Sequence, residues 1–241
     1  MPRVRGARPR FRPPGRFQLH RNRRFAYAAR VPPKIDAALS ARARRALCRR
    51  DPKLGSVIRR VGTCTLEPLG DPYRELLRSV IHQQLAGPAA RAISGRVKAH
   101  FGGRYPAPAR LLATPDPALR AAGLSGSKLN TLKGIAAAFD RGELSNRRLY
   151  GMEADAVVEA VTRIKGIGPW TAHMLLIFSL GHPDILPVGD YGVRKSAMDL
   201  YGLKDLPKPR ELEAVAESWR PYRSIGAWYL WRHLDNAPTD A

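Results

Sequence analysis

Residues 164–170 (IKGIGPW) are of types that can bind a phosphate group. The two glycines permit positive φ angles and leave backbone N–H groups open to close approach, while a proline is tolerated at the first position of a helix. A helix N-terminus attracts anions because its N–H groups are unpaired and its dipole is positive there. Taken together with the basic charge of the chain and the apolar helices expected on either side, the stretch predicts a helix–hairpin–helix that binds a DNA backbone without reading its sequence. A plain corner between two helices fits the same glycine spacing.

The charge of the chain favours a polyanionic partner. Its 42 Lys and Arg exceed its 20 Asp and Glu by +22, which suggests nucleic acid ahead of a membrane surface. Residues 1–30 hold ten Arg and no acid, so they are predicted to form a disordered basic arm. Two other interpretations of this arm stay open: a start site read too far upstream, and an Arg-rich transit peptide.

Several classes of protein are excluded by what the sequence lacks. Cys48 and Cys64 are the only cysteines, and their spacing offers no disulfide framework, zinc site or iron–sulfur cluster. No apolar run approaches the length of a membrane span, and the start has no apolar core of a secretory signal. We expect a soluble protein in a reducing, intracellular compartment.

Helical signals recur from Pro32 onward and predict an all-α fold of about ten helices, forming one helical domain over residues 31–241. The segment 71–85 has Asp71 as N-cap and Pro72 at the first position, and 114–123 has Thr114 as its cap. Residues 55–66 are interpreted as a short extended segment. Further helices are expected at 35–50, 125–142, 153–164 and 169–180, and from near Asp190, Pro209 and Pro221.

The stretch 164–202 (IKGIGPWTAHMLLIFSLGHPDILPVGDYGVRKSAMDLYG) resembles the helix–hairpin–helix (HhH-GPD) DNA glycosylase superfamily, and most of all its DNA-3-methyladenine glycosylase II, or AlkA-type, branch. RSVIHQQLAG (78–87), GLSGSKLNTLKGIA (123–136) and WRPYRSIGAWYLW (219–231) agree in the right order. The resemblance covers roughly residues 70–235. The arm 1–30 has no counterpart in it, and the chain is too short before 70 for the β-rich N-terminal domain of some relatives.

The resemblance implies two helical lobes with a lesion pocket between them, and a hairpin unit at 153–180. It implies a monofunctional glycosylase that flips alkylated purines (3-methyladenine, 7-methylguanine) out of duplex DNA and hydrolyses their N-glycosidic bond, which starts base-excision repair. The partner is then double-stranded DNA that contains alkylated bases. We expect a monomer with no membrane association, in the cytoplasm or nucleoid of a bacterium or the nucleus of a eukaryote.

Asp190, in PVGDYG, matches the catalytic aspartate of this family. Such a carboxylate stabilises the oxocarbenium-like sugar and orients or deprotonates the attacking water. An aspartate at a helix start is also an ordinary N-cap, and both roles are compatible. Gly189 stands where relatives often have a second acid. Trp170 stands where bifunctional relatives carry a Schiff-base lysine, so water is the predicted nucleophile.

The remaining site residues follow from the same resemblance. Trp170, Trp231 and Met174 are expected to line the lesion pocket, where indole faces attract cationic bases. Gln84 and Leu85 are expected to form the wedge that fills the gap of the flipped nucleotide. No catalytic metal, cofactor or iron–sulfur cluster is implied, apart from a monovalent cation at hairpin carbonyls. The hairpin residues expected to hold the DNA backbone are Lys165, Gly166, Ile167, Gly168 and Thr171.

Two alternative functions are compatible with the sequence. One is a glycosylase of the same fold for another lesion, such as hypoxanthine or uracil. The other is a DNA-binding protein without chemistry, in which Asp190 is only a helix cap. Pocket size and depth decide between lesions, and these depend on how the helices are placed.

Overall fold

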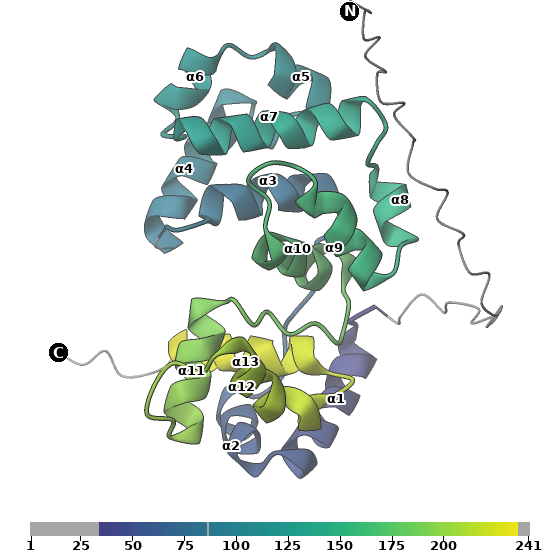
Figure 1. The fold of residues 1–241 in the computed structure, drawn as a ribbon, viewed down its shortest axis with the longest axis vertical. Helices are drawn as coiled ribbons and strands as arrows, with labels where there is room; N and C mark the ends of the chain where they lie inside the picture. The colour runs from purple at the N-terminus through teal and green to yellow at the C-terminus, as the bar shows by residue number, and fades with distance from the viewer. Residues whose placement is uncertain (1–33, 86, 236–241) are drawn as a thin grey trace, which may run out of the picture. The chain divides into compact units, whose positions relative to one another are not determined.

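The computed structural model describes residues 34–85 and 87–235, so the predicted arm 1–30 lies outside the described residues. Within these ranges the regular elements are all helical, thirteen α-helices with one π- and one 3₁₀-helix (Figure 1), which confirms the all-α prediction. None of these helices is long and apolar enough to cross a membrane. In chain order they are α1 (Ala37–Arg50), α2 (Pro52–Val61), α3 (Pro72–His82), α4 (Gly87–His100), α5 (Pro108–Ala113), α6 (Asp116–Ala121), α7 (Gly126–Asp140), α8 (Asn146–Tyr150), α9 (Ala154–Thr162), α10 (Pro169–Leu175), the π-helix η1 (Leu176–Leu180), α11 (Tyr191–Tyr201), α12 (Pro209–Val215), the 3₁₀-helix η2 (Ala216–Trp219) and α13 (Arg223–Asp235).

Aspartate side chains begin four of these helices. Asp36, Asp51, Asp71 and Asp190 each accept a hydrogen bond from the backbone N–H three residues later. This contact satisfies one of the N–H groups that a helix start leaves unpaired, and it places a negative charge at the positive end of the helix dipole. The caps therefore fix where α1, α2, α3 and α11 begin.

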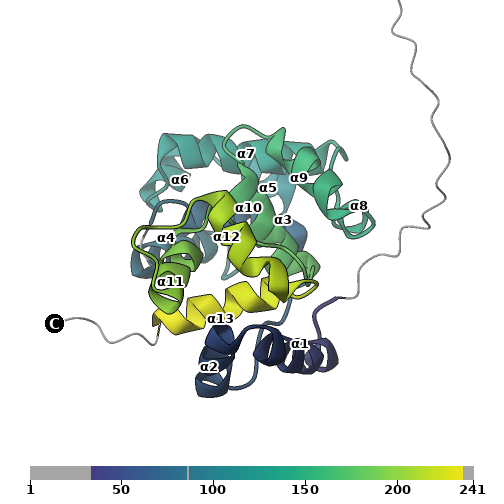
Figure 2. The same ribbon diagram turned by 60° about the horizontal axis from the view of Figure 1, so that its bottom comes forward.

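The helices form two lobes around two hydrophobic cores. The first lobe contains α3 to α10, and its core is mostly aliphatic, with Leu76, Leu129 and Leu175 among its fully buried side chains. The second lobe contains α1, α2 and α11 to α13, and its core includes the large buried rings of Trp219 and Tyr229. Figure 2 shows α13 running through the second lobe, where it packs against α2 and α11.

The continuous helix of α10 and η1 belongs to both cores. Leu175 and Leu176 are buried in the first core, whereas Met174 and Ile177 are buried in the second. The π-turn of η1 inserts an extra residue per turn, which changes the face that later side chains present. The helix that follows the hairpin is thus a shared wall between the lobes, and it ends at Gly181 as predicted, with φ 73°.

Two predicted details of the fold are wrong. Residues 55–66 are not an extended segment: α2 covers most of them, because Asp51 and Pro52 supply a helix start that the apolar pattern of the segment obscured. Thr114 does not cap 114–123, because its hydroxyl donates back to the Arg110 carbonyl of α5, and α6 begins only after Pro115. The helices α2, α4, α5 and α8 were not predicted.

Candidate active site between the lobes

A cavity of about 550 Å³ lies between the two lobes. Its walls come from α3, the shared helix α10–η1, the connection after α2, and the start of α11 together with α13. The predicted pocket residues Trp170, Trp231 and Met174 all line it, and so does Asp190. The first and last of these four residues are 61 positions apart in the sequence, and the packing of α10, α11 and α13 brings them together.

The Asp190 carboxylate is held by three hydrogen bonds. Its Oδ1 accepts from the backbone N–H of Val193 at 2.8 Å and from the indole Nε1 of Trp231 at 2.9 Å. Its Oδ2 accepts from the indole Nε1 of Trp170 at 2.7 Å. The first contact is the helix cap, so the cap and the pocket position coincide. A carboxylate oxygen has two lone pairs, so Oδ2 keeps one acceptor position that these contacts leave open.

Aromatic rings form one side of the cavity. Phe178 stacks on Trp231 with ring centroids 5.4 Å apart and an interplanar angle of 30°. Both side chains are half-buried, and Met174 is buried beside them. Flat, partly exposed rings that line a cavity offer stacking surface to a planar ligand, and their electron-rich faces attract cations.

An ion pair in the cavity wall was not anticipated from the sequence. Arg78 donates from Nε and Nη2 to the two oxygens of Glu75 at 2.8 Å each, and Ser79 donates to the same carboxylate. Glu75 is buried, whereas Arg78 lines the cavity with its guanidinium 5.6 Å from the Phe178 ring centre. The spacing of the pair, three residues apart on one helix, is the only signal in the sequence that could have indicated it.

His82 lines two cavities. A second cavity, of about 810 Å³, is lined by the end of α3, the hairpin and the start of α11, and it shares His82, Trp170 and Asp190 with the first. Burial lowers the pKa of His82, and nearby positive charges lower it further, Arg78 and Lys128 foremost. A neutral imidazole therefore stands at the junction of the two cavities near neutral pH.

The hairpin between α9 and α10 is built around Gly166. Its φ of 91° is in the region that favours glycine, and a Cβ there would lie 2.0 Å from Thr131 Oγ1 of α7. Ile167 is buried and anchors the turn, whereas Lys165 is exposed. The hairpin is thus fitted against α7 with its backbone at the surface.

Thr171, in the first turn of α10, is buried. Its side chain is 1% exposed, and its hydroxyl accepts a hydrogen bond from Gln83 Nε2 at 2.9 Å. Gln83 also donates to the Gly166 carbonyl at 3.1 Å. The Thr171 hydroxyl therefore joins the hairpin to the end of α3, and Thr171 also belongs to the lining of the second cavity. Its expected contact with the DNA backbone stays a prediction.

The predicted wedge follows directly after this link. α3 ends at His82, three residues before the predicted end, and Gln84 then takes a positive φ of 55°. Non-glycine residues rarely adopt this conformation, and it is often found at functional sites. Lys128 Nζ donates to the carbonyls of Ile81 and Gln83, which caps the end of α3. Gln84 and Leu85 are exposed beside the second cavity.

Metal-ligating side chains do not gather in the part of the chain described. Residues 34–85 and 87–235 contain no cluster of three or more His, Cys, Asp or Glu that could hold a metal ion. At the hairpin, the Gly166 carbonyl accepts one hydrogen bond from Gln83 and has a second lone pair to offer.

The chain is similar to proteins of known family. The alkylbase DNA glycosidase-like protein mag2 of Schizosaccharomyces pombe is 31% identical over 196 residues, covering 79% of this chain and 92% of that protein. DNA-3-methyladenine glycosylase 1 of the same yeast is 37% identical over 164 residues, covering 67% and 72%. The solved structure of the yeast 3-methyladenine DNA glycosylase Mag1 in complex with abasic DNA matches with a TM-score of 0.76 and 33% identity, covering 79% of this chain and 95% of that one.

The family model described as HhH-GPD superfamily base excision DNA repair protein matches residues 77–221, which include the hairpin, the shared helix and Asp190. This range is more than half of the chain. Together with the glycine-built hairpin and the cavity between two helical lobes, it shows that the chain belongs to the HhH-GPD superfamily of base excision DNA repair proteins.

Proposed function

We propose that the protein is a monofunctional DNA glycosylase that hydrolyses the N-glycosidic bond of alkylated purines in duplex DNA and so initiates base-excision repair. Relatives named 3-methyladenine glycosylases support this proposal. The observation that carries it is the Asp190 carboxylate, which is fixed by two indole N–H groups and one backbone N–H while it faces a cavity.

Asp190 supplies the charge that the reaction needs. As the base leaves, the sugar becomes oxocarbenium-like, and a carboxylate held in place beside it stabilises that charge without reorganising. The open acceptor position on Oδ2 can orient a water molecule toward the anomeric carbon and take its proton. Trp170 has no amine, so the sugar forms no Schiff base with it and the product is an abasic site.

The surface around the cavity supports base flipping. Gln84 and Leu85 project beside the second cavity and can fill the gap that the flipped nucleotide leaves. The hairpin from Lys165 to Gly168 can hold a phosphate on its backbone N–H groups, with a monovalent cation at its carbonyls. These contacts offset the cost of unstacking, about a few kcal/mol.

The cavity walls suit a planar base. The indoles of Trp170 and Trp231 attract a cationic purine by about 0.5–2 kcal/mol. Alkylated purines leave readily because their departure neutralises the positive charge, so a second acid is not required. Arg78 adds a hydrogen-bond donor, which favours bases that present a carbonyl oxygen.

The test is release of free bases from methylated duplex DNA, followed by chromatography. We expect free 3-methyladenine or 7-methylguanine and an abasic strand, and no covalent enzyme–DNA adduct on treatment with borohydride. A trapped adduct would contradict monofunctional chemistry. Binding to lesion DNA with no base released would instead support a binding protein. The proposed reaction places the protein with the genome, in the nucleoid or the nucleus.

A further inference from the structure

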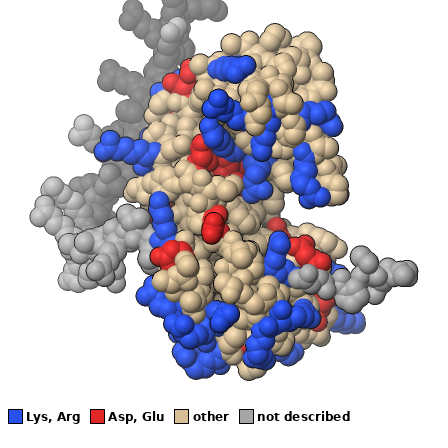
Figure 3. Space-filling model, turned by 180° about the vertical axis from the view of Figure 1, so that it is seen from behind, with Lys and Arg blue, Asp and Glu red and all other residues tan. Residues whose placement is uncertain are grey.

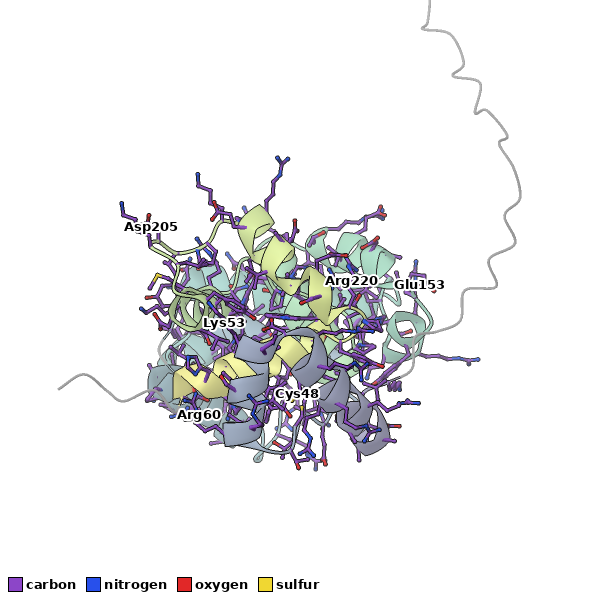
Figure 4. All side chains as sticks on the ribbon, turned by 90° about the horizontal axis from the view of Figure 1, so that it is seen from below. Cys48, Lys53, Arg60, Glu153, Asp205 and Arg220 are labelled. Atoms are coloured by element: carbon purple, nitrogen blue, oxygen red, sulfur yellow. The ribbon has the colours of Figure 1, made fainter. Side chains whose placement is uncertain are left out.

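The two N-terminal helices carry an exposed basic face outside the candidate active site. Figure 3 shows Lys and Arg over both lobes, with several of them side by side on the lower one, and Figure 4 views that lobe from below, with Lys53 and Arg60 labelled. All the basic side chains of α1 and α2 are exposed. The α1–α2 face consists of Arg42, Arg44, Arg45, Arg49, Arg50, Lys53, Arg59 and Arg60.

The charge of this face is not neutralised locally. Residues 34–62 contain nine Lys and Arg and two Asp, a net charge of +7. Both aspartates are used as N-caps, of α1 and α2, and Asp51 is buried. The salt bridges recorded among the described residues all involve other side chains. Arg50 and Arg60 bond to the Arg220 carbonyl and to His233, so they keep their charge.

The face is hollowed between the two helices. A cavity of about 590 Å³ is lined by Arg44, Arg45 and Arg49 of α1 and by Arg59 of α2, with Cys48, Ile58 and Gly62 between them. None of these residues lines the cavity between the lobes or the second cavity, which lies beside the hairpin. Four guanidinium groups around one groove match the geometry of phosphate oxygens, which arginine binds with paired donors.

Other occupants fit this face less well. A second copy of the chain would be repelled, because each copy has a net charge of +22. The residues before α1 offer no counter-charge, since 1–30 contain ten Arg and no acid. A membrane surface would call for apolar side chains on the same face, yet the exposed large hydrophobic residues in the described chain are Leu69, Leu85 and Tyr191, none of them on α1 or α2.

The face is continuous with the proposed DNA side. Arg60 contacts His233 near the end of α13, two residues after Trp231 of the lesion cavity. The neighbouring Leu234 side chain lies 3.5 Å from where a Cβ on Gly192 would be, beside Asp190. The C-terminal end of α13 therefore links the basic face to the start of α11, which lines the cavity at the hairpin.

We propose that the α1–α2 face is a second binding surface for duplex DNA, which takes backbone phosphates away from the flipped nucleotide in the groove formed by Arg44, Arg45, Arg49 and Arg59. It acts without reading sequence, and it raises affinity for any duplex, damaged or not. The inference needs only that DNA is the partner, so it can be tested on undamaged DNA whether or not the protein cleaves a glycosidic bond.

The experiment compares two variants of the full chain that lose the same charge in different places. The groove variant replaces Arg44, Arg45, Arg49 and Arg59 by Gln. The control variant replaces four exposed arginines of the other lobe by Gln: Arg104, Arg110, Arg141 and Arg147. Binding to an undamaged duplex of about three helical turns is followed by fluorescence anisotropy across a salt series. Circular dichroism verifies that both variants are folded.

Each phosphate contact contributes about 0.9 to the slope of log K against log salt. We expect the groove variant to lose about 2 to 4 of that slope and to bind at least about tenfold more weakly at low salt, while the control loses less than about 1. Equal losses in the two variants would overturn the proposal, because net charge alone would then explain binding. Unchanged DNA binding with weaker binding to phosphatidylserine vesicles would overturn it in favour of a membrane.

Discussion

Two buried aspartates in this protein have the same local structure and different surroundings. Asp51 caps α2 through Leu54, and its Oδ2 accepts from the indole of Trp219 and the phenol of Tyr201. Asp190 caps α11 and accepts from two indoles. Both aspartates are buried: Asp51 is 7% exposed and Asp190 is 9% exposed. A helix cap with two aromatic donors is thus a structural device that this fold uses twice.

The surroundings separate the two sites. Trp219 is fully buried in the second core, and Asp51 lines none of the three cavities described above. The indoles that hold Asp190 are half-buried and line the cavity between the lobes. The same hydrogen bonds therefore fix a carboxylate against a core in one case and beside a potential substrate in the other. The cap itself does not distinguish a catalytic aspartate; the space in front of it does.

The difference between Asp190 and Asp51 can be tested by replacing each with asparagine. Of all the substitutions proposed, the change at Asp190 should reduce the reaction rate most. We expect Asp190→Asn to lower the single-turnover rate of base release by at least about 10²–10³-fold, because the fixed negative charge is lost. We expect Asp51→Asn to keep the rate and to lower the free energy of unfolding by about 1–3 kcal/mol, because a buried donor is left unsatisfied. Base release with enzyme in excess and urea unfolding measure the two effects.

The Asn side chain can still cap a helix, so α11 should form in the Asp190 variant, and lesion DNA should still bind. Full base release by Asp190→Asn would refute the catalytic role. An equal loss of rate in the Asp51 variant would mean that both substitutions act through stability.

Removing single indole donors sharpens the comparison. Phenylalanine at 170 or 231 keeps a ring in the cavity wall and deletes one hydrogen bond to Asp190, whereas Trp219→Phe deletes one to Asp51. We expect each pocket variant to lose about five- to tenfold in rate at saturating DNA, the equivalent of about one hydrogen bond. Trp219→Phe should lower the urea midpoint of unfolding and leave the rate of base release unchanged. Rate losses that appear only below saturation would indicate a role in binding instead.

The cavity that Asp190 lines can also be changed at Arg78 of α3, which is part of the same lining. Arg78→Met combined with Glu75→Gln removes the guanidinium donor without leaving a buried charge unpaired. We expect the ratio of 7-methylguanine to 3-methyladenine released to fall by about two- to tenfold, because a donor to the guanine carbonyl is lost. The control is Arg74→Met, one turn earlier on α3 and outside the cavity. An unchanged ratio would assign the pair to packing alone.

A pH series gives the smallest expected effect and concerns stability. Burial lowers the pKa of His173 on the shared helix and that of His182 just after it, below the ordinary value of 6.5. The unfolded chain therefore binds protons first as the pH falls through about 6.5, so stability should decline from pH 7.5 to 5. His173→Phe should flatten this decline in urea unfolding at several pH values. A wild-type slope in the variant would show that His173 does not contribute.

Most helices that position the site could be predicted from local signals. Asp71 with Pro72, the glycine pair before Pro169, and Asp190 are start signals that act within a few residues. Helices α5 and α8 were missed because they are short, and α2 and α4 because glycine interrupts their helical pattern, so the stability of all four comes from packing. The π-turn in η1 has no sequence signal, since it depends on which core each side chain enters.

The site was predicted through family resemblance, and the structure adds what resemblance does not carry. That Trp170, Met174, Asp190 and Trp231 share one cavity depends on the packing of the two lobes. Three features depend on rotamers and on contacts between helices. They are the hydrogen bonds from two indoles to Asp190, the ion pair of Arg78 with Glu75, and the burial of Thr171. The assignment of catalysis to Asp190 and of the wedge to Gln84 stays a prediction.

The shared helix α10–η1 has a consequence for how such enzymes can be diversified. One edge of this helix is buried in each core, and its first turn follows the hairpin. Residues 164–180 should therefore be exchanged between related proteins only as one unit. A crossover within this segment would combine the hairpin of one protein with the cavity-lining residues of another, and it would disturb the packing of both cores. New base preferences are more accessible through the few side chains of α3 and α13 that line the cavity, such as Arg78 and Arg232, because these can vary without changing the hairpin.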